Sequence, residues 1–481
     1  MGYGRKKIYT DATEITAENV VREVRKALLI HLENRADIDK LYGYLRGKTA
    51  ILDKTRDVRP NINHKINEAR AYEIVSFYKG YTFGEPIQYV RRENATSKAK
   101  DDEIAADINA LNGYMADAGK AACDNKLAEW MYTAGTTFRT TLPNPKWEKD
   151  GDEPPIRIFT TDPRNTFVVY NSGIDEQPVM AVHYVKQEDG NIVFSVYTDD
   201  NYFELTDYSD NVKKEPHALG MIPIIEYPAD NSRLGIFEIV VPLLDALDEL
   251  QSNRLDDVVQ CVNSFLALLG GDMSEEVYKK VEEWKMLCLP EGTDAKYLSE
   301  PMRQSDIQTL KNDLYESILT ICGIPNRNGG SSTSDTGSAV LMRDGWQSAE
   351  ARAKATELIF KESEMQFLKL VLRILRDTVG TKLRLTDIEP HFTRRNYDNI
   401  QSKAQVLVSM LNNPKIHPEL AFAHCGMFPD PESAYLQSKA WWEENERKQE
   451  QKEAEKLADT GDGAVPPVQQ ETDGSERSRA S

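Results

Sequence analysis

Two helical patterns flank the polar run Asn326-Arg-Asn-Gly-Gly-Ser-Ser-Thr-Ser-Asp-Thr-Gly337, and together they decide the fold. The pattern before the run covers Ser305 to Cys322, where five apolar residues recur at helical spacing: Ile307, Leu310, Leu314, Ile318 and Ile321. The pattern after it begins at Ser338 and can continue to Val379. That is roughly 40 residues, or about 60 Å at 1.5 Å per residue, with Gly345 as a candidate kink.

A further helix is predicted upstream, from about Leu234 to Asn263. Pro242 would kink it, so a break or a later start there is the alternative. One face is apolar, and the opposite face carries Asp245, Glu249 and Asp256. Between this helix and the one at Ser305 lies a compact insert, residues 266–301. It has apolar runs at Phe265–Leu269 and Met286–Leu289, with the charged segment Ser274–Lys285 between them.

The amino-acid composition limits which classes of function are possible for this chain. The chain has 481 residues, 59 Lys and Arg against 78 Asp and Glu, and a net charge of −19. A protein that grips nucleic acid through phosphates normally carries basic patches, so the balance argues against tight non-specific DNA binding. Five scattered cysteines without a CxxC pair suggest reduced thiols in a cytosol. No secretion signal and no apolar run long enough to span a membrane is found.

The N-terminal part reads as helices followed by short strands. The helices are predicted at 16–31, 37–45, 62–83, 101–111 and 113–133. From Phe138 to Tyr227 the apolar period changes to two, with turn residues between the runs. The spacing predicts an antiparallel meander inside a helical platform, and hence an α+β fold. The predicted strands are 87–90, 156–160, 167–170, 179–185, 192–197, 202–205 and 222–227.

The C-terminal part reads as one strand, three helices and a tail. The strand is predicted at Leu383–Phe392, and the helices at 399–411, 418–424 and 431–457. From Asp459 onward few residues are apolar, so we expect this segment to be disordered.

Known catalytic patterns do not occur. There is no HExxH motif, no GxSxG elbow and no Gly-Lys-Ser/Thr ending that would turn the polar run into a phosphate loop. His417, His424 and Cys425 lack the spacing of a zinc site. We therefore predict no catalytic residue, no metal and no cofactor. The polar run is open to two interpretations, a flexible connector or a mobile functional loop.

Several segments resemble the portal proteins of long-tailed double-stranded-DNA phages, of the Bacillus-siphophage type. Tyr42-Gly-Tyr-Leu-Arg-Gly-Lys-Thr-Ala-Ile-Leu52, Asn61-Ile-Asn-His-Lys-Ile-Asn-Glu-Ala-Arg70 and Gly80-Tyr-Thr-Phe-Gly-Glu-Pro-Ile-Gln-Tyr89 are similar to successive parts of that family. Gly220-Met-Ile-Pro-Ile-Ile-Glu-Tyr227 with Glu238–Asp257, and Ser338-Ala-Val-Leu341, resemble later ones. Taken together and in this order, the similar segments span most of residues 17–440. The opening Asn231-Ser-Arg-Leu-Gly-Ile-Phe-Glu238 departs from the family's pattern.

The resemblance implies a ring, usually of twelve copies, at one capsid vertex. It also implies portal architecture, with wing, stem, clip and crown, long helices and an antiparallel β-rich wing. The implied parts are 1–231 as helices and wing, 232–265 as first stem helix, 266–301 as clip, 302–325 as second stem helix, 326–337 as tunnel loop, 338–395 as long wing helix and strand, 396–457 as crown and 458–481 as disordered tail.

The same resemblance implies functional positions and partners. Double-stranded DNA would pass through the channel, and the DNA-facing loop would comprise Arg327, Asn328, Gly329, Gly330, Ser331, Ser332, Thr333, Ser334 and Asp335. The implied partners are the terminase large subunit, the major capsid and scaffolding proteins and a head-completion adaptor. The protein would be a virion component, assembled in the host cytoplasm, and not an enzyme.

Physical arguments are consistent with a channel. A closed ring uses head-to-tail contacts, which suits helices too long to be buried alone. Asp245, Glu249 and Asp256 would form an acidic channel face that repels phosphates. Two rival classes remain: an α-rich cytosolic protein-binding scaffold without a DNA channel, and a nucleic-acid enzyme, which would need a metal-binding acid cluster or a nucleotide loop.

Overall fold

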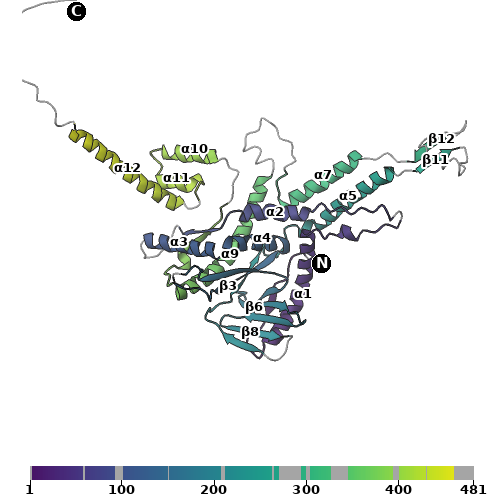
Figure 1. Cartoon of the computed structure of the whole chain (residues 1–481), viewed down its shortest axis with the longest axis horizontal. Coiled ribbons are helices and arrows are strands. Elements are labelled where there is room, and N and C mark those ends of the chain that lie inside the picture. Colours follow the sequence, from purple (N-terminus) through teal and green to yellow (C-terminus); the bar gives the residue numbers. More distant parts are fainter. Residues whose placement is uncertain are drawn as a thin grey trace, which may run out of the picture. The chain divides into compact units, whose positions relative to one another are not determined.

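The computed structural model describes residues 3–57, 60–92, 101–149, 151–206, 212–262, 265–269, 294–298, 304–326, 345–393, 400–428 and 431–459. The chain forms two compact units, Met1–Arg395 and Asn396–Ser481. The first unit combines helices with several sheets (Figure 1). The mixed helix and sheet content agrees with the α+β prediction.

The largest sheet has six strands in the order β1-β5-β6-β7-β8-β9. The predicted antiparallel meander is confirmed for β5 to β8, because each neighbouring pair among them is antiparallel. Its last strand, β9, was not predicted, and the predicted strands 156–160 and 222–227 belong to a second sheet. The first strand, β1, was not predicted and pairs parallel to β5. It has only three residues, too few to show a period. The strands are β1 Ile8–Thr10, β5 Thr166–Asn171, β6 Pro178–Lys186, β7 Ile192–Tyr197, β8 Asn201–Thr206 and β9 Lys213–Pro216.

The first helix, α1 (Val20–Leu45), covers this sheet. It buries Val20, Val24 and Ala27 in one apolar cluster with strand residues such as Val182. The sequence predicted two helices here, at 16–31 and 37–45, and that prediction is wrong. Residues 32–36 contain no glycine or proline, so nothing interrupts the helix.

A second sheet has the order β10-β3-β4, with all pairs antiparallel. Its central strand, β3 (Thr136–Pro143), was not predicted, whereas β4 (Ile156–Thr161) and β10 (Ile224–Pro228) were. Six successive residues of β3 are buried, and most of them are threonine or arginine. A strand that is buried on both faces does not alternate, so the period-two signal fails.

Three helices of the platform also differ from the prediction. The second, α2, covers Arg70–Phe83 rather than starting at Ile62, because residues 61–69 form a turn followed by a non-helical segment. The next two are α3 (Asp101–Asp117) and α4 (Lys120–Ala134). They separate at Gly119, whose φ of +68° is costly for other residues, and not at Asn112 as predicted.

The predicted helix pair forms an arm, which we define as α5, α7 and the strands between them (Figure 1). The helix α5 covers Val241–Val262 and is preceded by a 3₁₀ turn at Glu238–Val240. The later start, the alternative raised by Pro242, is the correct one, since proline is tolerated in a first helical turn. The helix α7 covers Gln304–Cys322, as predicted.

Within the arm, β11 (Phe265–Leu269) pairs antiparallel with β12 (Asp294–Leu298). The first apolar run of the predicted insert therefore forms a strand. The second run, Met286–Leu289, and the charged segment lie outside the described residues.

The long helix α9 covers Trp346–Thr378 and crosses the largest apolar core. Gly345 precedes it with a φ of +82°, so a helix arriving from Ser338 would end there rather than kink. Residues 338–344 lie outside the described residues. After α9, a 3₁₀ turn (Leu385–Asp387) leads into β13 (Ile388–His391), which pairs antiparallel with β2 (Gln88–Arg91).

The second unit contains α10 (Ile400–Leu411), α11 (Pro418–Cys425) and α12 (Pro431–Asp459). These helices confirm the three predicted at 399–411, 418–424 and 431–457. The core is small, with Ala421, Phe422 and Cys425 buried. The rest of the predicted tail, from 460 onward, lies outside the described residues.

Candidate functional site

The two long helices of the arm run side by side away from the body (Figure 1). Arg254 on α5 joins them: its Nε donates to Gln304 Oε1 at 2.7 Å and its Nη1 to Gln308 Oε1 at 2.9 Å. On α7 only Ile318, Leu319 and Cys322, at the inner end, are buried. Beyond this buried end, the hydrogen bonds of Arg254 link the two helices.

A non-helical segment, residues 61–69, lies along α5, and we call it the strap. Three of its backbone N–H groups donate to side chains of α5. His64 N donates to Asp256 Oδ1 at 2.8 Å, Ile66 N to Ser252 Oγ at 2.9 Å, and Glu68 N to Asp248 Oδ1 at 2.9 Å.

The spacing of these contacts follows from elementary geometry. Alternate strap residues meet α5 residues that are four positions apart, in the opposite chain direction. Two residues of extended chain advance about 6.6 Å, and four residues of α-helix advance about 6.0 Å. The two repeats match closely enough for three successive bonds, so the strap satisfies its N–H groups without forming a helix or joining a sheet.

Asp256 on α5 is paired with three basic side chains, and its own side chain is fully buried. Lys54 Nζ lies 2.9 Å from Oδ2, Arg56 Nη2 lies 3.3 Å from the same oxygen, and His64 Nδ1 lies 2.7 Å from Oδ1. Burial alone would raise the pKa of Asp256, but the His64 N–H and the Lys54 ammonium hold it at about 2.

This arrangement corrects the predicted acidic face of α5. Asp256 is buried and paired with cations, so it presents no free charge to solvent. Asp245 is half-buried and accepts a hydrogen bond from Tyr44 Oη at 2.8 Å, while Glu249 is exposed. The polar face of α5 was identified correctly. The sequence could not show that the strap covers part of it, because the strap is nearly 200 residues away along the chain.

Glu68 connects the strap to both helices of the arm. Its backbone N–H bonds to Asp248 on α5, and its carboxylate lies 2.6 Å from Lys311 Nζ on α7. Burial would raise the pKa of Glu68, but Lys311 and Arg70 lower it below its ordinary value. One residue thus fixes the spacing of the two helices.

We expect Asp256→Asn to loosen the strap. The change removes the charge that Lys54 and Arg56 neutralise and costs about 2 kcal/mol. Trypsin should then cleave faster at Lys54, Arg56 or Lys65, whereas Asp257→Asn, an exposed neighbour, should leave the cleavage rate unchanged. Equal cleavage of the two variants would contradict the assigned pairing.

The pH dependence has a defined sign. The pKa of Asp256 is lower in the folded protein than its ordinary 3.8, so its charge stabilises the fold above that pH. That contribution is lost as the pH falls from 3.8 towards about 2. We expect the difference in urea midpoint between wild type and Asp256→Asn to shrink over that range.

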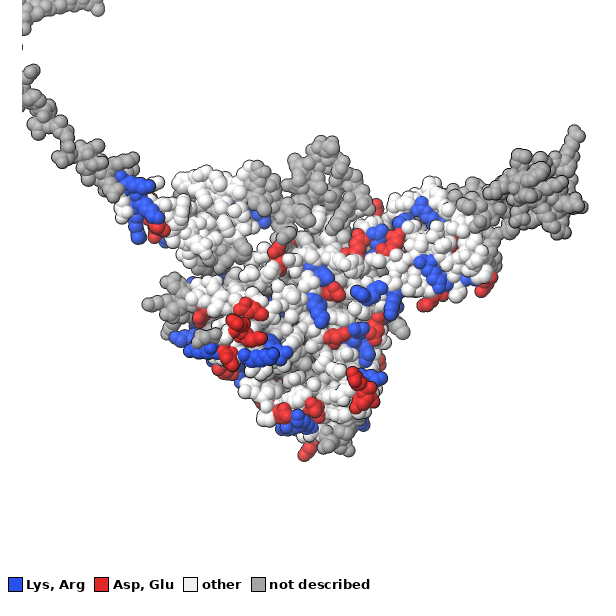
Figure 2. Space-filling model, in the orientation of Figure 1, with Lys and Arg blue, Asp and Glu red and all other residues white. Residues whose placement is uncertain are grey.

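The outward face of α7 carries acidic residues that sequence reasoning did not single out. Asp306, Asp313 and Glu316 are exposed there, and spacings of seven and three residues place them on one side of the helix. The sequence analysis predicted the apolar stripe of α7. It did not identify these acidic residues as a separate surface of the helix. Figure 2 shows Lys and Arg side chains among Asp and Glu over the visible face of the arm.

The predicted DNA-facing residues, Arg327 to Asp335, lie outside the described residues. The structure describes only their surroundings. The chain leaves α7 through Gly323, Ile324 and Pro325, and it resumes at Gly345 as the start of α9. The polar run therefore connects the arm with the long helix of the body.

A buried ionic cluster anchors α9 in the body. Glu364 of α9 accepts from Arg139 Nη1 at 2.7 Å and lies 3.0 Å from Lys120 Nζ. Tyr89 Oη and Tyr227 Oη also donate to it, at 2.5 and 2.8 Å. The other carboxylate is Asp124, which pairs with Lys120 at 2.6 Å and with Arg139.

The charges of this cluster balance. Two carboxylates face one guanidinium and one ammonium, and all four side chains are almost completely buried. Burial would raise the pKa of Glu364, but Arg139 and Lys120 hold it well below its usual range. Glu364 therefore stays charged at neutral pH, and the ion pairs of the cluster fix the position of α9 against α4 and β3.

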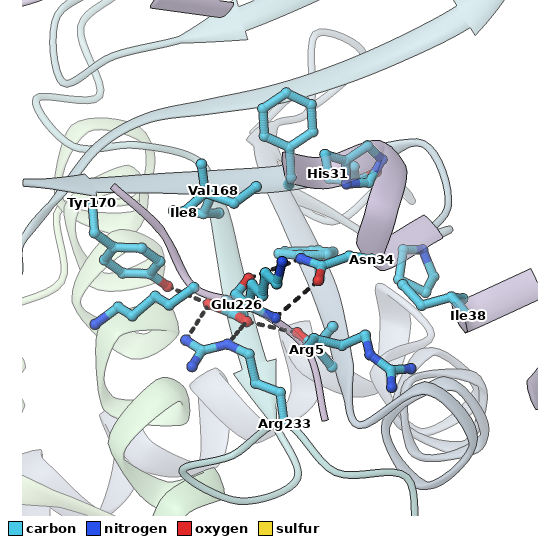
Figure 3. Close-up of a pocket in the computed structure, with 16 residues that line it drawn as sticks. Arg5, Ile8, His31, Asn34, Ile38, Val168, Tyr170, Glu226 and Arg233 are labelled. Atoms are coloured by element: carbon cyan, nitrogen blue, oxygen red, sulfur yellow. Dashed lines mark hydrogen bonds and ion pairs between the residues drawn. The ribbon is translucent and has the colours of Figure 1, made fainter. Parts of the chain in front are cut away.

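The cavity in Figure 3 is too small for a ligand. Its volume is about 20 Å³, which is room for about one water molecule. Glu226 at its wall is already bound by Arg233, Tyr170 and Thr136. Within the described part of the chain, no group of three His, Cys, Asp or Glu residues could hold a metal ion. The helices described there also include none with the length and apolarity to cross a bilayer.

Comparison with known proteins gives one family. The family model described as "Phage portal protein, SPP1 Gp6-like" matches residues 26–457, which is most of the chain. The match includes the strap, the arm, the polar run, α9 and the first two helices of the second unit. No curated protein sequence matches the chain.

Proposed function

Because this chain belongs to the family of SPP1 Gp6-like phage portal proteins, we propose that its copies form a closed ring around a DNA channel at one capsid vertex. In such proteins the ring is usually of twelve copies. The single observation that carries this proposal is the family match over residues 26–457, which includes both helices of the arm. The channel would serve for DNA packaging and ejection.

The surface of the arm supports a ring. Leu310 and Ile321 of α7 are 49% and 43% exposed, although both belong to the apolar stripe of that helix. A single chain leaves these two members of the stripe exposed to water, which is unfavourable for apolar side chains that recur on one face of a helix. In a ring, head-to-tail contacts bring a neighbouring arm against each arm and cover the stripe.

The acidic wall of the channel is assigned to carboxylates that are not fully buried. The exposed Asp306, Asp313 and Glu316 on α7 join the exposed Glu249 and the half-buried Asp245 on α5, and Asp256 is excluded because it is buried and paired. A wall of this charge repels the DNA backbone and limits adhesion to moving DNA. Arg327, Asn328 and the residues up to Asp335 form the loop that touches the DNA.

The remaining parts follow the family architecture. The β11–β12 end of the arm acts as the clip, where the terminase large subunit and later the head-completion adaptor dock. The second unit forms the crown, and the first unit without the arm forms the wing. The major capsid and scaffolding proteins surround the ring, which is assembled in the host cytoplasm and remains in the virion.

The test of this function is the native mass of the purified full-length protein, with negative-stain images of the same sample. Rings of about a dozen copies with a central hole are the expected result. If the protein stays monomeric or dimeric and also fails to enter capsids when expressed with the capsid and scaffolding proteins, the portal role is wrong. A protein-binding scaffold without a channel would then be the better description.

The loop has its own prediction. Replacing Gly329–Ser334 with a short rigid linker should leave rings intact and abolish DNA packaging, because α7 and α9 have buried residues of their own that hold them in the first unit. Packaged DNA protected from nuclease is the measurement. A deletion of equal length within residues 460–481 is the control and should package normally. Normal packaging by the loop variant would disprove the DNA-facing role.

A further inference from the structure

The inner end of α7, where the chain leaves the arm, is held by groups from two other helices. An α-helix leaves its last four backbone carbonyls without partners inside the helix. In α7 these carbonyls belong to residues 319–322. Each of the four accepts a hydrogen bond in the structure, so this helix end is completely satisfied.

The chain itself supplies donors for the first two carbonyls. Ile324 N donates to Leu319 O at 2.9 Å, and Gly323 N donates to Thr320 O at 3.1 Å. Gly323 has a φ of +69°, and these two bonds around a left-handed glycine form a Schellman motif. Ile324 and Leu319 also belong to the same apolar core, which is the hydrophobic contact that accompanies the motif. The motif ends α7 at one defined residue.

The other two carbonyls are satisfied from outside α7. Arg352 of α9 donates from its Nη2 to Ile321 O at 2.9 Å. Tyr78 of α2 donates from its Oη to Cys322 O at 2.8 Å, and this hydroxyl lies 3.1 Å from Gly323 O. A cation at the C-terminal end of a helix also interacts favourably with the helix dipole. Figure 1 shows the inner end of α7 beside α2 and the start of α9. We call Tyr78, residues 321–325 and Arg352 the joint.

Gly323 fits between the two donors because it has no side chain. A Cβ atom placed on it would lie 3.1 Å from Tyr78 Oη and 3.4 Å from Arg352 Nε. It would also lie 3.8 Å from the backbone oxygen of Ser348, in the first turn of α9. Both donors are therefore packed directly against the turn that ends α7.

The polar run begins and ends at the joint. A Cβ atom placed on Gly345, which precedes α9, would lie 3.9 Å from the Cα atom of Pro325. The two flanks of the run are thus in contact, although they are separated along the chain. The place from which the run leaves the body is set by the turn after α7 and by the side chains that hold this turn.

Arg352 is the member of the joint that core packing does not explain. Its side chain is exposed, whereas Ile318, Leu319 and Cys322 already bury the inner end of α7. We propose that Arg352 is a positioning residue for the polar run: by holding the last turn of α7 against α9, it fixes the point from which the run reaches the DNA. This proposal rests on the DNA-facing role proposed above for the run.

Hydrogen exchange of the full-length protein tests the joint. In Arg352→Ala the last turn of α7 opens more often, and we expect peptides with the amides of Gly323 and Ile324 to exchange about ten-fold faster, the factor for losing one hydrogen bond from a charged donor. Lys354→Ala is the matched control, because Lys354 is an exposed cation of the same helix whose Nζ lies 3.5 Å from Glu350. Equal exchange in the two variants overturns the proposal.

A second variant tests the same turn from α2. Tyr78→Phe keeps the buried ring and removes only the hydroxyl that serves Cys322 O. The exchange of the Gly323 and Ile324 amides should again become faster. If neither Tyr78→Phe nor Arg352→Ala changes this exchange, the joint does not hold the end of α7.

DNA packaging tests the positioning role, which a purely structural role would not reproduce. Arg352→Ala should form rings and unfold at the wild-type urea midpoint, because Arg352 is exposed, but it should lose nuclease-protected DNA. Arg352→Lys keeps a cation at the end of α7 and should restore packaging, and Lys354→Ala should package normally.

The outcomes separate this proposal from the proposed function. If Arg352→Ala packages DNA like wild type while the replacement of Gly329–Ser334 abolishes packaging, the positioning role is wrong and the DNA-facing role of the run stands. If wild type forms neither rings nor packaged DNA, the proposed function fails and the positioning role fails with it.

Discussion

Replacing Gly135 with alanine is expected to destabilise the protein by about 3 kcal/mol or more. Gly135 has a φ of +78° and lies between α4 and β3. A Cβ atom there would overlap the backbone carbonyl of Arg233 and lie only 2.8 Å from the carbonyl carbon of Leu234. Backbone atoms cannot rotate away, so the loop that leads into α5 has to move, and the arm moves with it.

Gly190→Ala is the matched control. Gly190 has a φ of +92°, but no atom lies within 4 Å of a Cβ placed there. It therefore carries the conformational penalty alone, about 1 kcal/mol. Urea unfolding followed by tryptophan fluorescence measures both variants at one protein concentration, because assembly shifts the apparent stability. Similar losses for the two variants would show that the close approach at Gly135 does not matter.

Arg139→Ala should cost about 3–5 kcal/mol. The guanidinium is completely buried and pairs with Asp124 and Glu364. Its removal leaves two buried carboxylates with Lys120 as their only remaining cation in the cluster, together with the cavity of the lost side chain. Since Glu364 belongs to α9, we also expect that helix to lose its fixed position against β3.

The control for Arg139 is Arg157→Ala on the adjacent strand β4. Arg157 is exposed and stacks over Phe159, so its loss should change the free energy of unfolding by about 0.5 kcal/mol or less. Hydrogen exchange of the α9 amides gives a local readout, and faster exchange is expected only in Arg139→Ala. If Arg139→Ala matches the control in both measurements, the cluster does not anchor α9.

Both variants bear on the proposed channel through the position of the arm. Gly135 sets where the chain enters α5, and Arg139 holds the helix that follows the polar run. A ring requires every arm to take the same position, so either displacement should lower the fraction of protein found as rings.

Much of the fold could be predicted because its signals are local. The period of two identified β5 to β8, and the helical period identified α7 and the three helices of the second unit. Where both faces of an element are buried, as in β3, the period disappears and the prediction failed. The candidate site was predicted less well: Glu249 was placed on an exposed face correctly, whereas Asp256 was not.

The sequence by itself determined the family, the meander, the helical pair of the arm and the long helix after the polar run. Only the tertiary structure decided that residues 61–69 are a strap and that Asp256 is buried. The N–H groups of His64, Ile66 and Glu68 find acceptors on α5 at a distance of nearly 200 residues along the chain. The periodicity of apolar residues shows which side of an element is buried. Hydrogen bonds between segments that are distant in the sequence do not change this periodicity, so it cannot reveal them.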